Sequence, residues 1–208
     1  MKIIHLFYNL MNLYGEYGNV LALKRTLEAK GENVEIVRIT LGDEFDFRDC
    51  AMIYIGSGTE RSQKAALEYL QPYRDALYSA WKGGTDILAT GNSFEMFGEK
   101  ITDVNGNEHK GLGFFDFVTL EGDKRIVTDS LCEFEGKEII GFVNKASRIY
   151  GIEKPFFTVK QGTGNSEKET DREGIKTDGF YGTHIIGPLM VRNPDMTEYF
   201  ANQIISND

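Results

Sequence analysis

The first half of the chain alternates between two patterns of apolar residues. Short apolar runs, typical of strands, occur at residues 2–7, 33–39, 51–55 and 87–89. Apolar residues at steps of three and four, the spacing of a helix that buries one face, occupy residues 16–30 and 62–82. Pro72 is expected to split the second helix, because proline removes a backbone donor. Strands and helices in this rhythm predict a parallel sheet with right-handed crossovers.

The second half is a series of short strand-like runs separated by glycine or aspartate. These runs lie at residues 114–120, 124–128, 138–143 and 156–159. Asn105-Gly106 is a turn signal that suits a hairpin, and helix patterns begin at residues 94–97 and 194–205. We therefore expect one α/β domain over residues 1–208, with a β-rich C-terminal half.

Composition narrows the possible partners. The 208 residues carry a formal net charge of −9, which argues against nucleic acid or an anionic membrane as the main partner. No apolar run approaches the roughly 18 residues of a membrane span, and the N-terminus does not resemble a signal peptide, so we expect a cytoplasmic protein. The two cysteines and three histidines show no metal-ligand spacing, and we expect no metal site and no cofactor.

Three loops are expected where parallel strands end, at residues 9–18, 56–63 and 90–93. Open α/β sheets place their ligands at this edge. Gly56-Ser57-Gly58 is no dinucleotide fingerprint, because Arg61 stands where the third glycine would be. Its backbone N–H groups can instead approach an anion or oxyanion, although a tight turn that merely needs glycine explains the same residues.

The segment over residues 85–98 is the most informative in the chain. An apolar run over 87–89 enters a Gly91-Asn92-Ser93 turn, and Phe94, Met96 and Phe97 follow at helix-like spacing. This strand, turn and helix can hold a side chain at the end of a sheet, above the N–H groups of a helix N-terminus.

Motifs with one order and spacing run through nearly the whole chain. They are Asn12-Leu13-Tyr14-Gly15-Glu16-Tyr17-Gly18-Asn19-Val20, Gly56-Ser57-Gly58-Thr59-Glu60-Arg61-Ser62-Gln63, Gly111-Leu112-Gly113, Gly141-Phe142-Val143-Asn144, Gly162-Thr163-Gly164-Asn165 and Gly182-Thr183 with Gly187-Pro188-Leu189. In these motifs the chain resembles a class I glutamine amidotransferase of the cobyric acid synthase (CobB/CobQ) type, most of all the glutaminase subunit of lipid II isoglutaminyl synthase. The resemblance implies a flavodoxin-like, three-layer fold with a parallel or mixed sheet.

The resemblance also implies a mechanism whose reactive residues this chain lacks. In the family, a cysteine attacks the glutamine amide, a histidine shuttles protons, and the ammonia passes to a synthetase. In register, the cysteine falls on Gly91 and the histidine on Ile186, and Lys145 replaces the histidine of a further family motif. Losing such a nucleophile costs about 10⁶ in rate. We therefore expect a scaffold or ligand-sensing subunit without glutaminase activity, partnered by a Mur-ligase-like or other amide-forming synthetase.

The alternative is an active amidotransferase with a displaced nucleophile. Ser93 lies near the tip of the turn, and His184 is two residues before Ile186, so a Ser93–His184 pair is conceivable. Ser93 equally suits a helix N-cap, and His184 a packed strand residue. Cys50 precedes the third strand at the far end of the sheet and Cys132 lies in the β-rich half, so neither easily replaces the thiol.

The pocket can still bind glutamine or a related small anion. Arg61, Arg125 and Arg148 are the cationic candidates, since a guanidinium suits a carboxylate. The resemblance places Arg125 near the family region that selects the glutamine carboxylate, although a solvated surface arginine explains the residue equally well. The expected ligand-binding set is Gly56, Gly58, Arg61, Asn92, Arg125 and Asn144.

Overall fold

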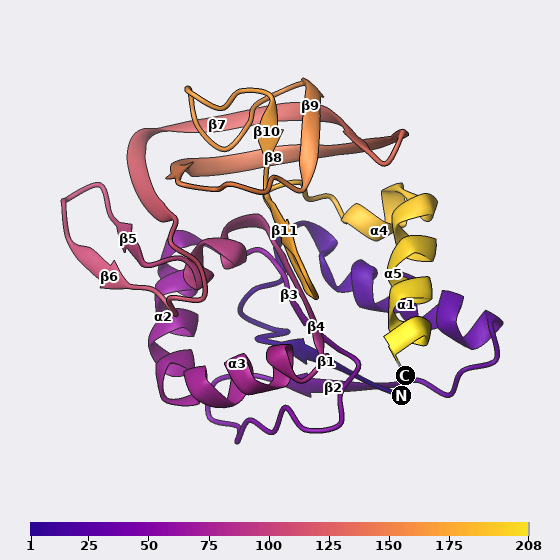
Figure 1. Ribbon diagram of the computed structural model, residues 1–208. Helices are drawn as coiled ribbons and strands as arrows, with labels where there is room; N and C mark the ends of the chain where they lie inside the picture. Colours follow the sequence, from indigo (N-terminus) through magenta and orange to yellow (C-terminus); the bar gives the residue numbers. More distant parts are fainter. Residues whose placement is uncertain (208) are drawn as a thin grey trace.

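The computed structural model describes residues 1–207 and contains two sheets (Figure 1). The first sheet has the order β11-β12-β4-β3-β1-β2 and consists of β1 (Lys2–Leu6), β2 (Glu35–Ile39), β3 (Met52–Ile55), β4 (Asp86–Thr90), β11 (Ile175–Thr177) and β12 (Phe180–Thr183). Its strands pair in parallel, except that β11 is antiparallel to β12. The predicted parallel sheet is confirmed, with one antiparallel strand at its edge.

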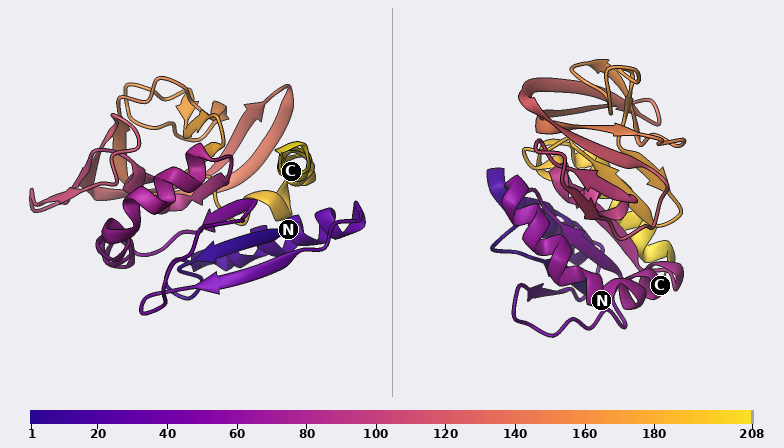
Figure 2. Two further views of the ribbon diagram at one scale, coloured as in Figure 1. Left: turned by 60° about the horizontal axis from the view of Figure 1, so that its bottom comes forward. Right: turned by 90° about the vertical axis from the view of Figure 1, so that its left-hand side faces the viewer.

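Helices cover both faces of this sheet (Figures 1 and 2). They are α1 (Tyr17–Ala29), α2 (Glu60–Leu70), α3 (Arg74–Lys82), α4 (Leu189–Arg192) and α5 (Pro194–Asn207). Successive residues of β1 point to opposite faces: Ile3 packs in the core beneath α1 and α5, and Ile4 in the core beneath α2 and α3. The three-layer architecture therefore follows from the doubly apolar strands.

A second sheet lies across the carboxyl ends of the first (Figure 1). It consists of β5 (Lys100–Thr102), β6 (Glu108–Lys110), β7 (Val118–Phe134), β8 (Lys137–Tyr150), β9 (Phe157–Gln161) and β10 (Arg172–Glu173). β7 and β8 form a long antiparallel hairpin, interrupted by a register shift between Glu121 and Ile126. This hairpin forms one wall of the cleft described below, and the expected β-rich C-terminal half is confirmed.

The expected helices, strands and turns are confirmed, with two differences: the bounds of one strand and the type of one helix. A short 3₁₀ turn, η2 (Gln71–Tyr73), contains Pro72 and separates α2 from α3, as expected from the proline. The strand expected at 114–120 begins only at Val118, and it joins the strand expected at 124–128 in the single strand β7, because the hairpin continues through its register shift. The helix expected from residue 94 is a 3₁₀ helix, η3 (Gly91–Phe97), which begins inside the turn itself. Within residues 1–207, no helix is long and apolar enough to cross a membrane.

Candidate functional site

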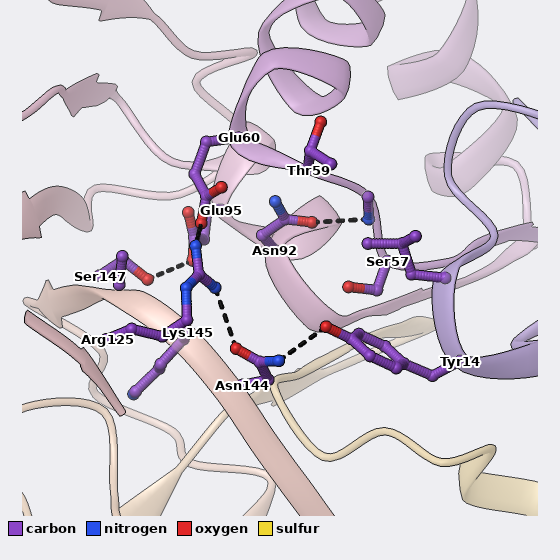
Figure 3. Close-up of a pocket in the computed structure, with 13 residues that line it drawn as sticks. Tyr14, Ser57, Thr59, Glu60, Asn92, Glu95, Arg125, Asn144, Lys145 and Ser147 are labelled. Carbon is purple, nitrogen blue, oxygen red and sulfur yellow. Dashed lines mark hydrogen bonds and ion pairs between the residues drawn. The ribbon is translucent and has the colours of Figure 1, made fainter. Parts of the chain in front are cut away.

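A cavity of about 180 Å³ opens where the first sheet meets the β7–β8 hairpin (Figure 3). It is lined by residues from the 3₁₀ turn η1 (Leu13–Gly15), the loop between β3 and α2 with the first residue of α2, the η3 turn and the hairpin. The sequence predicted that the loops after β1, β3 and β4 would meet at one edge of the sheet, and they do. The hairpin wall was not predicted.

Gly91 follows directly on β4 and has a left-handed backbone conformation. Its φ of +65° lies in the left-handed region, which favours glycine. A Cβ placed on Gly91 would lie 2.3 Å from Ser57 Oγ and 2.4 Å from Ser57 Cβ, far inside van der Waals contact. The loop after β3 therefore fills the space into which a side chain at position 91 would project.

The glycines of the loop after β3 have different surroundings. The Gly58 N–H, a candidate oxyanion donor, already donates to Asn92 Oδ1 at 3.0 Å. Gly56 lies deeper, where an added Cβ would be 2.5 Å from the Met11 carbonyl oxygen. Gly58 and Asn92 line the cavity, whereas Gly56 serves close packing. The Gly58 N–H is thus already bonded to a side chain of the chain itself.

Ser93 and His184 are both buried, and their hydrogen bonds go to different partners. The Ser93 hydroxyl is bonded to the main-chain oxygens of Ile55 at 3.0 Å and Thr90 at 2.8 Å. His184 follows β12, whose last residue Thr183 pairs with Thr90, and its Nε2 lies 2.9 Å from Glu95 Oε1. Ser93 is not the N-cap of η3 either, since that position belongs to Thr90.

His184 belongs to a buried cluster with Glu95, Glu173 and Lys145. His184 N donates to Glu173 Oε1 at 2.7 Å, and Lys145 Nζ lies 3.4 Å from His184 Nδ1. Burial, followed by the nearby Lys145 charge, lowers the pKa of His184 to about 4, so the imidazole is neutral at pH 7. Burial raises the pKa of Glu95 to about 7 and lowers the pKa of Lys145 to about 8. Glu95 and Lys145 also line the cavity.

Ile186 is buried, and its backbone is hydrogen-bonded to β8. Its backbone N–H donates to the Phe142 carbonyl at 3.0 Å, and its carbonyl accepts from Phe142 N at 3.2 Å. This bridge joins the segment after β12 to the hairpin strand β8. The position matched to the family histidine therefore holds an apolar side chain at a junction between the two sheets.

Polar residues at the mouth of the cavity form a chain of contacts (Figure 3). Arg125 forms an ion pair with Glu60 and donates to Asn144 Oδ1 at 3.0 Å. Asn144 Nδ2 in turn donates to the Tyr14 hydroxyl at 2.6 Å. Arg125 and Asn144, both expected to bind ligand, are thus brought together beside the cavity.

The other cationic candidates lie elsewhere. Arg61 is exposed on α2 and does not line the cavity. Arg148 Nε lies 3.7 Å from Glu167 Oε2. Cys50 and Cys132 are buried free thiols, away from the cavity lining. Among residues 1–207, no cluster of three or more His, Cys, Asp or Glu side chains could hold a metal ion.

Sequence reasoning missed three residues that shape this cavity: Glu95, Ser147 and Tyr14. The sequence contains one signal for Glu95, which is a carboxyl residue inside the turn segment over residues 85–98. The side chains of Ser147 and Tyr14 gave no comparable signal, since their positions depend on the hairpin wall and on the positive φ of Tyr14. Ser147 donates its hydroxyl proton to Glu95 Oε1.

Known proteins resemble this chain in sequence and in fold. A family model described as the CobB/CobQ-like glutamine amidotransferase domain matches residues 2–193. The lipid II isoglutaminyl synthase (glutamine-hydrolyzing) subunit GatD of Staphylococcus aureus (strain N315) is 30% identical over 204 residues, which are 98% of this chain and 84% of the relative. The subunit of the same name from Streptococcus pneumoniae (strain ATCC BAA-255 / R6) is 28% identical, over 94% of this chain and 77% of the relative.

Two solved structures share the fold. The crystal structure of a glutamine amidotransferase superposes with a TM-score of 0.65 at 12% identity, covering 97% of this chain and 98% of the other. The glutaminase domain of Trypanosoma brucei CTPS, with bound acivicin, gives a TM-score of 0.57 at 8% identity and covers 100% of this chain and 95% of the other. At these identities the likeness concerns the fold alone.

Proposed function

The chain belongs to the CobB/CobQ-like glutamine amidotransferase family, and from that premise we propose that it is an amidotransferase-fold subunit that does not hydrolyse glutamine itself. Its role is that of a scaffold or ligand sensor for an amide-forming synthetase of the Mur-ligase type. Both curated relatives are named as subunits of a synthase, which supports a partnered role. We also propose that residues 1–208 act as one domain.

One observation carries this proposal: the turn after β4 presents Gly91 and has no room for a nucleophile. Ser57 fills the space beside Gly91, and Asn92 Oδ1 accepts the hydrogen bond of the Gly58 N–H. The family reaction needs a thiolate, a proton-shuttling base and free oxyanion donors in one place. Gly91 has no nucleophilic side chain and Ile186 cannot act as a base. The attack of a thiolate on the glutamine amide therefore cannot occur at these positions.

The cavity supports a ligand-sensing role. Arg125 is 43% exposed and has N–H groups beyond those given to Glu60 and Asn144, so it can still reach a carboxylate. The chain of contacts from Glu60 through Arg125 and Asn144 to Tyr14 spans α2, the hairpin and η1. Glutamine or a related small anion bound at Arg125 would rearrange this chain, and so change the surface that a partner meets.

A glutaminase assay tests the proposal directly. We expect glutamate release from glutamine to stay at the level of a no-protein control, both with the chain alone and with its synthetase partner. Ser93→Ala and His184→Ala serve as matched variants for the displaced-nucleophile alternative. Glutamine hydrolysis by the wild-type chain that disappears in Ser93→Ala would overturn the proposal.

The partner is tested by affinity capture from the native host with tagged chain. We expect a Mur-ligase-like synthetase to be retained and identified by mass spectrometry. Retention of no amide-forming enzyme would remove the partnered role, whatever the outcome of the assay.

A further inference from the structure

The cavity contains a serine that is hydrogen-bonded to a carboxylate, and the family reaction assigns neither residue a role. Ser147, on β8, donates its hydroxyl proton to Glu95 Oε1, on η3 (Figure 3). Both side chains are nearly buried, with Ser147 3% exposed and Glu95 1% exposed, yet both line the cavity. A nucleophile bonded to a base inside a cleft is the basic requirement of serine-based acyl transfer.

Glu95 is held in place by two further side chains. Gln63 Nε2 donates to Glu95 Oε2 at 2.7 Å, and His184 Nε2 lies 2.9 Å from Glu95 Oε1. Burial raises the pKa of Glu95 to about 7, which suits a group that takes up and returns a proton near neutral pH. The neutral His184 and the side-chain amide of Gln63 hold this carboxylate in place. In a catalytic triad, the third residue holds the base in the same way.

Asn92 offers a donor for developing negative charge. Its Oδ1 accepts from the Gly58 N–H, so the side-chain amide is fixed with Nδ2 free of that bond. Figure 3 draws this nitrogen on the other branch of the amide from the oxygen bonded to Gly58, and Asn92, Glu95 and Ser147 line the same cavity. A fixed amide N–H that faces a reacting carbonyl acts as an oxyanion donor.

We propose that Ser147 and Glu95 form a reaction centre that hydrolyses small acyl esters, with Ser147 as nucleophile and Glu95 as general base. Ser147 Oγ attacks the acyl carbon, its proton passes to Glu95, and the carbonyl oxygen takes the negative charge beside Asn92. Collapse of the adduct breaks the ester bond, and Glu95 returns the proton to the leaving alcohol. Water then attacks acyl-Ser147 by the same route, releasing the acid and restoring the serine.

The size and charge of the cavity define the substrate class. A cavity of about 180 Å³ admits an acyl group of a few carbon atoms rather than a long chain. Arg125 at the mouth favours an ester that carries a carboxylate. This activity does not depend on the proposed subunit role, because it uses neither Gly91 nor a partner.

The decisive experiment uses the wild-type chain and a fluorophosphonate, a probe that forms a covalent bond with activated serines. We expect one stoichiometric adduct, mapped by peptide mass spectrometry to Ser147. We also expect p-nitrophenyl acetate to give a burst of p-nitrophenol equal to the amount of protein. No adduct after prolonged exposure, or an adduct on Ser57 or Ser93 in place of Ser147, would overturn the inference without requiring any variant to fold.

Variants then separate catalysis from structure. Ser147→Ala should lose the adduct and the burst, and Glu95→Gln should slow labelling about 10²- to 10⁴-fold while keeping the side-chain shape. Ser93→Ala is the matched control, because Ser93 is equally buried but bonded to main-chain oxygens, and its labelling rate should equal that of wild type. Equal labelling of Glu95→Gln and wild type would reject Glu95 as the base.

The pH profile provides a readout that a purely structural role would not move. The labelling rate should rise as Glu95 loses its proton, near pH 7, and Glu95→Gln should lose this inflection. The other titratable groups that face Glu95 are His184, Lys145 and Glu60, all of which Glu95→Gln retains. If wild type hydrolyses glutamine through Ser147, the reaction centre stands and the proposed absence of glutaminase activity fails, so the two are separable.

Discussion

At the scale of single residues, Gly91 leaves no room for a side chain, although it is not itself among the residues that line the cavity. A side chain there meets two costs, the left-handed backbone and the overlap with Ser57. Gly91→Ala should therefore lower the free energy of unfolding by about 3 kcal/mol, measured by urea denaturation. Ser57→Gly in the same background should recover part of that loss, because it removes the overlap with Ser57 Oγ and Cβ but keeps the tight 3.2 Å approach to Ser57 Cα and the backbone cost.

Gly113 provides the control for this prediction. It has almost the same backbone, with φ of +62°, but an added Cβ would meet nothing within 4 Å. Gly113→Ala should cost only the backbone term, about 1 kcal/mol. Equal losses at the two glycines would mean that the loop carrying Ser57 moves aside at no cost.

Some properties of single residues could be predicted from the sequence, and others could not. Alignment with a family motif needs only the order of residues. The sequence alone therefore matched Gly91 and Ile186 to the family cysteine and histidine. The partners of Ser93 and His184 do not, because a hydroxyl in a turn can face the cleft or the backbone. The Ser147–Glu95 contact joins β8 to η3 across the boundary between two sheets, and no local spacing encodes it.

At the scale of elements, the β7–β8 hairpin is held against the first sheet through Gly141. An added Cβ at Gly141 would lie 2.4 Å from Ile185 Cγ2 and 2.9 Å from the Ile186 carbonyl oxygen. Gly141→Ala should therefore push the hairpin off the segment after β12, lowering the free energy of unfolding by about 2 kcal/mol. Because Arg125 and Asn144 lie on this hairpin, ligand binding at the mouth should weaken as well.

Gly122, on the same hairpin, gives the matched comparison. Its added Cβ would have one neighbour, the Ala146 carbonyl oxygen at an ordinary 3.5 Å. Gly122→Ala should change the unfolding free energy by less than about 0.5 kcal/mol. If Gly122→Ala were as costly as Gly141→Ala, the effect would belong to the hairpin backbone rather than to its contact with the segment after β12.

The central elements of the first sheet were predictable because β1, β3 and β4 are buried on both faces and each helix buries one stripe, whereas the partly exposed edge strand β11 was not predicted. Periodicity records burial, so β3 and α1 were found within one or two residues of their bounds. The hairpin was harder, because its outer face is exposed and its register shift resembles the end of a strand. Its crossing over the cleft depends on packing between distant elements, which a sequence pattern does not record.

At the scale of the whole molecule, one buried carboxyl connects the elements around the cleft. Glu16 Oε2 accepts from the Tyr54 hydroxyl of β3 at 2.9 Å and from the Thr90 hydroxyl of β4, and Oε1 accepts from Gly187 N at 3.2 Å. Burial raises the pKa of Glu16 to about 7, despite these hydrogen bonds. Protonation of this one group is therefore coupled to unfolding of the whole chain.

The sign of that coupling gives a prediction for global stability. Between about pH 4.5 and pH 7, Glu16 keeps its proton in the folded chain and loses it on unfolding, so its contribution to stability falls as pH rises through this window. The free energy of unfolding of wild type minus that of Glu16→Gln, from urea titrations, should decrease by up to about 3 kcal/mol from pH 4.5 to 7 and stay level above it. Burial lowers the pKa of His5 and His184 to about 4, so their contribution to stability rises with pH. Both histidines are present in wild type and in Glu16→Gln, so this contribution cancels in the difference between the two free energies. A difference that stays constant across the window would show that Glu16 is ionised in the folded chain, and that its hydrogen bonds outweigh the cost of burial.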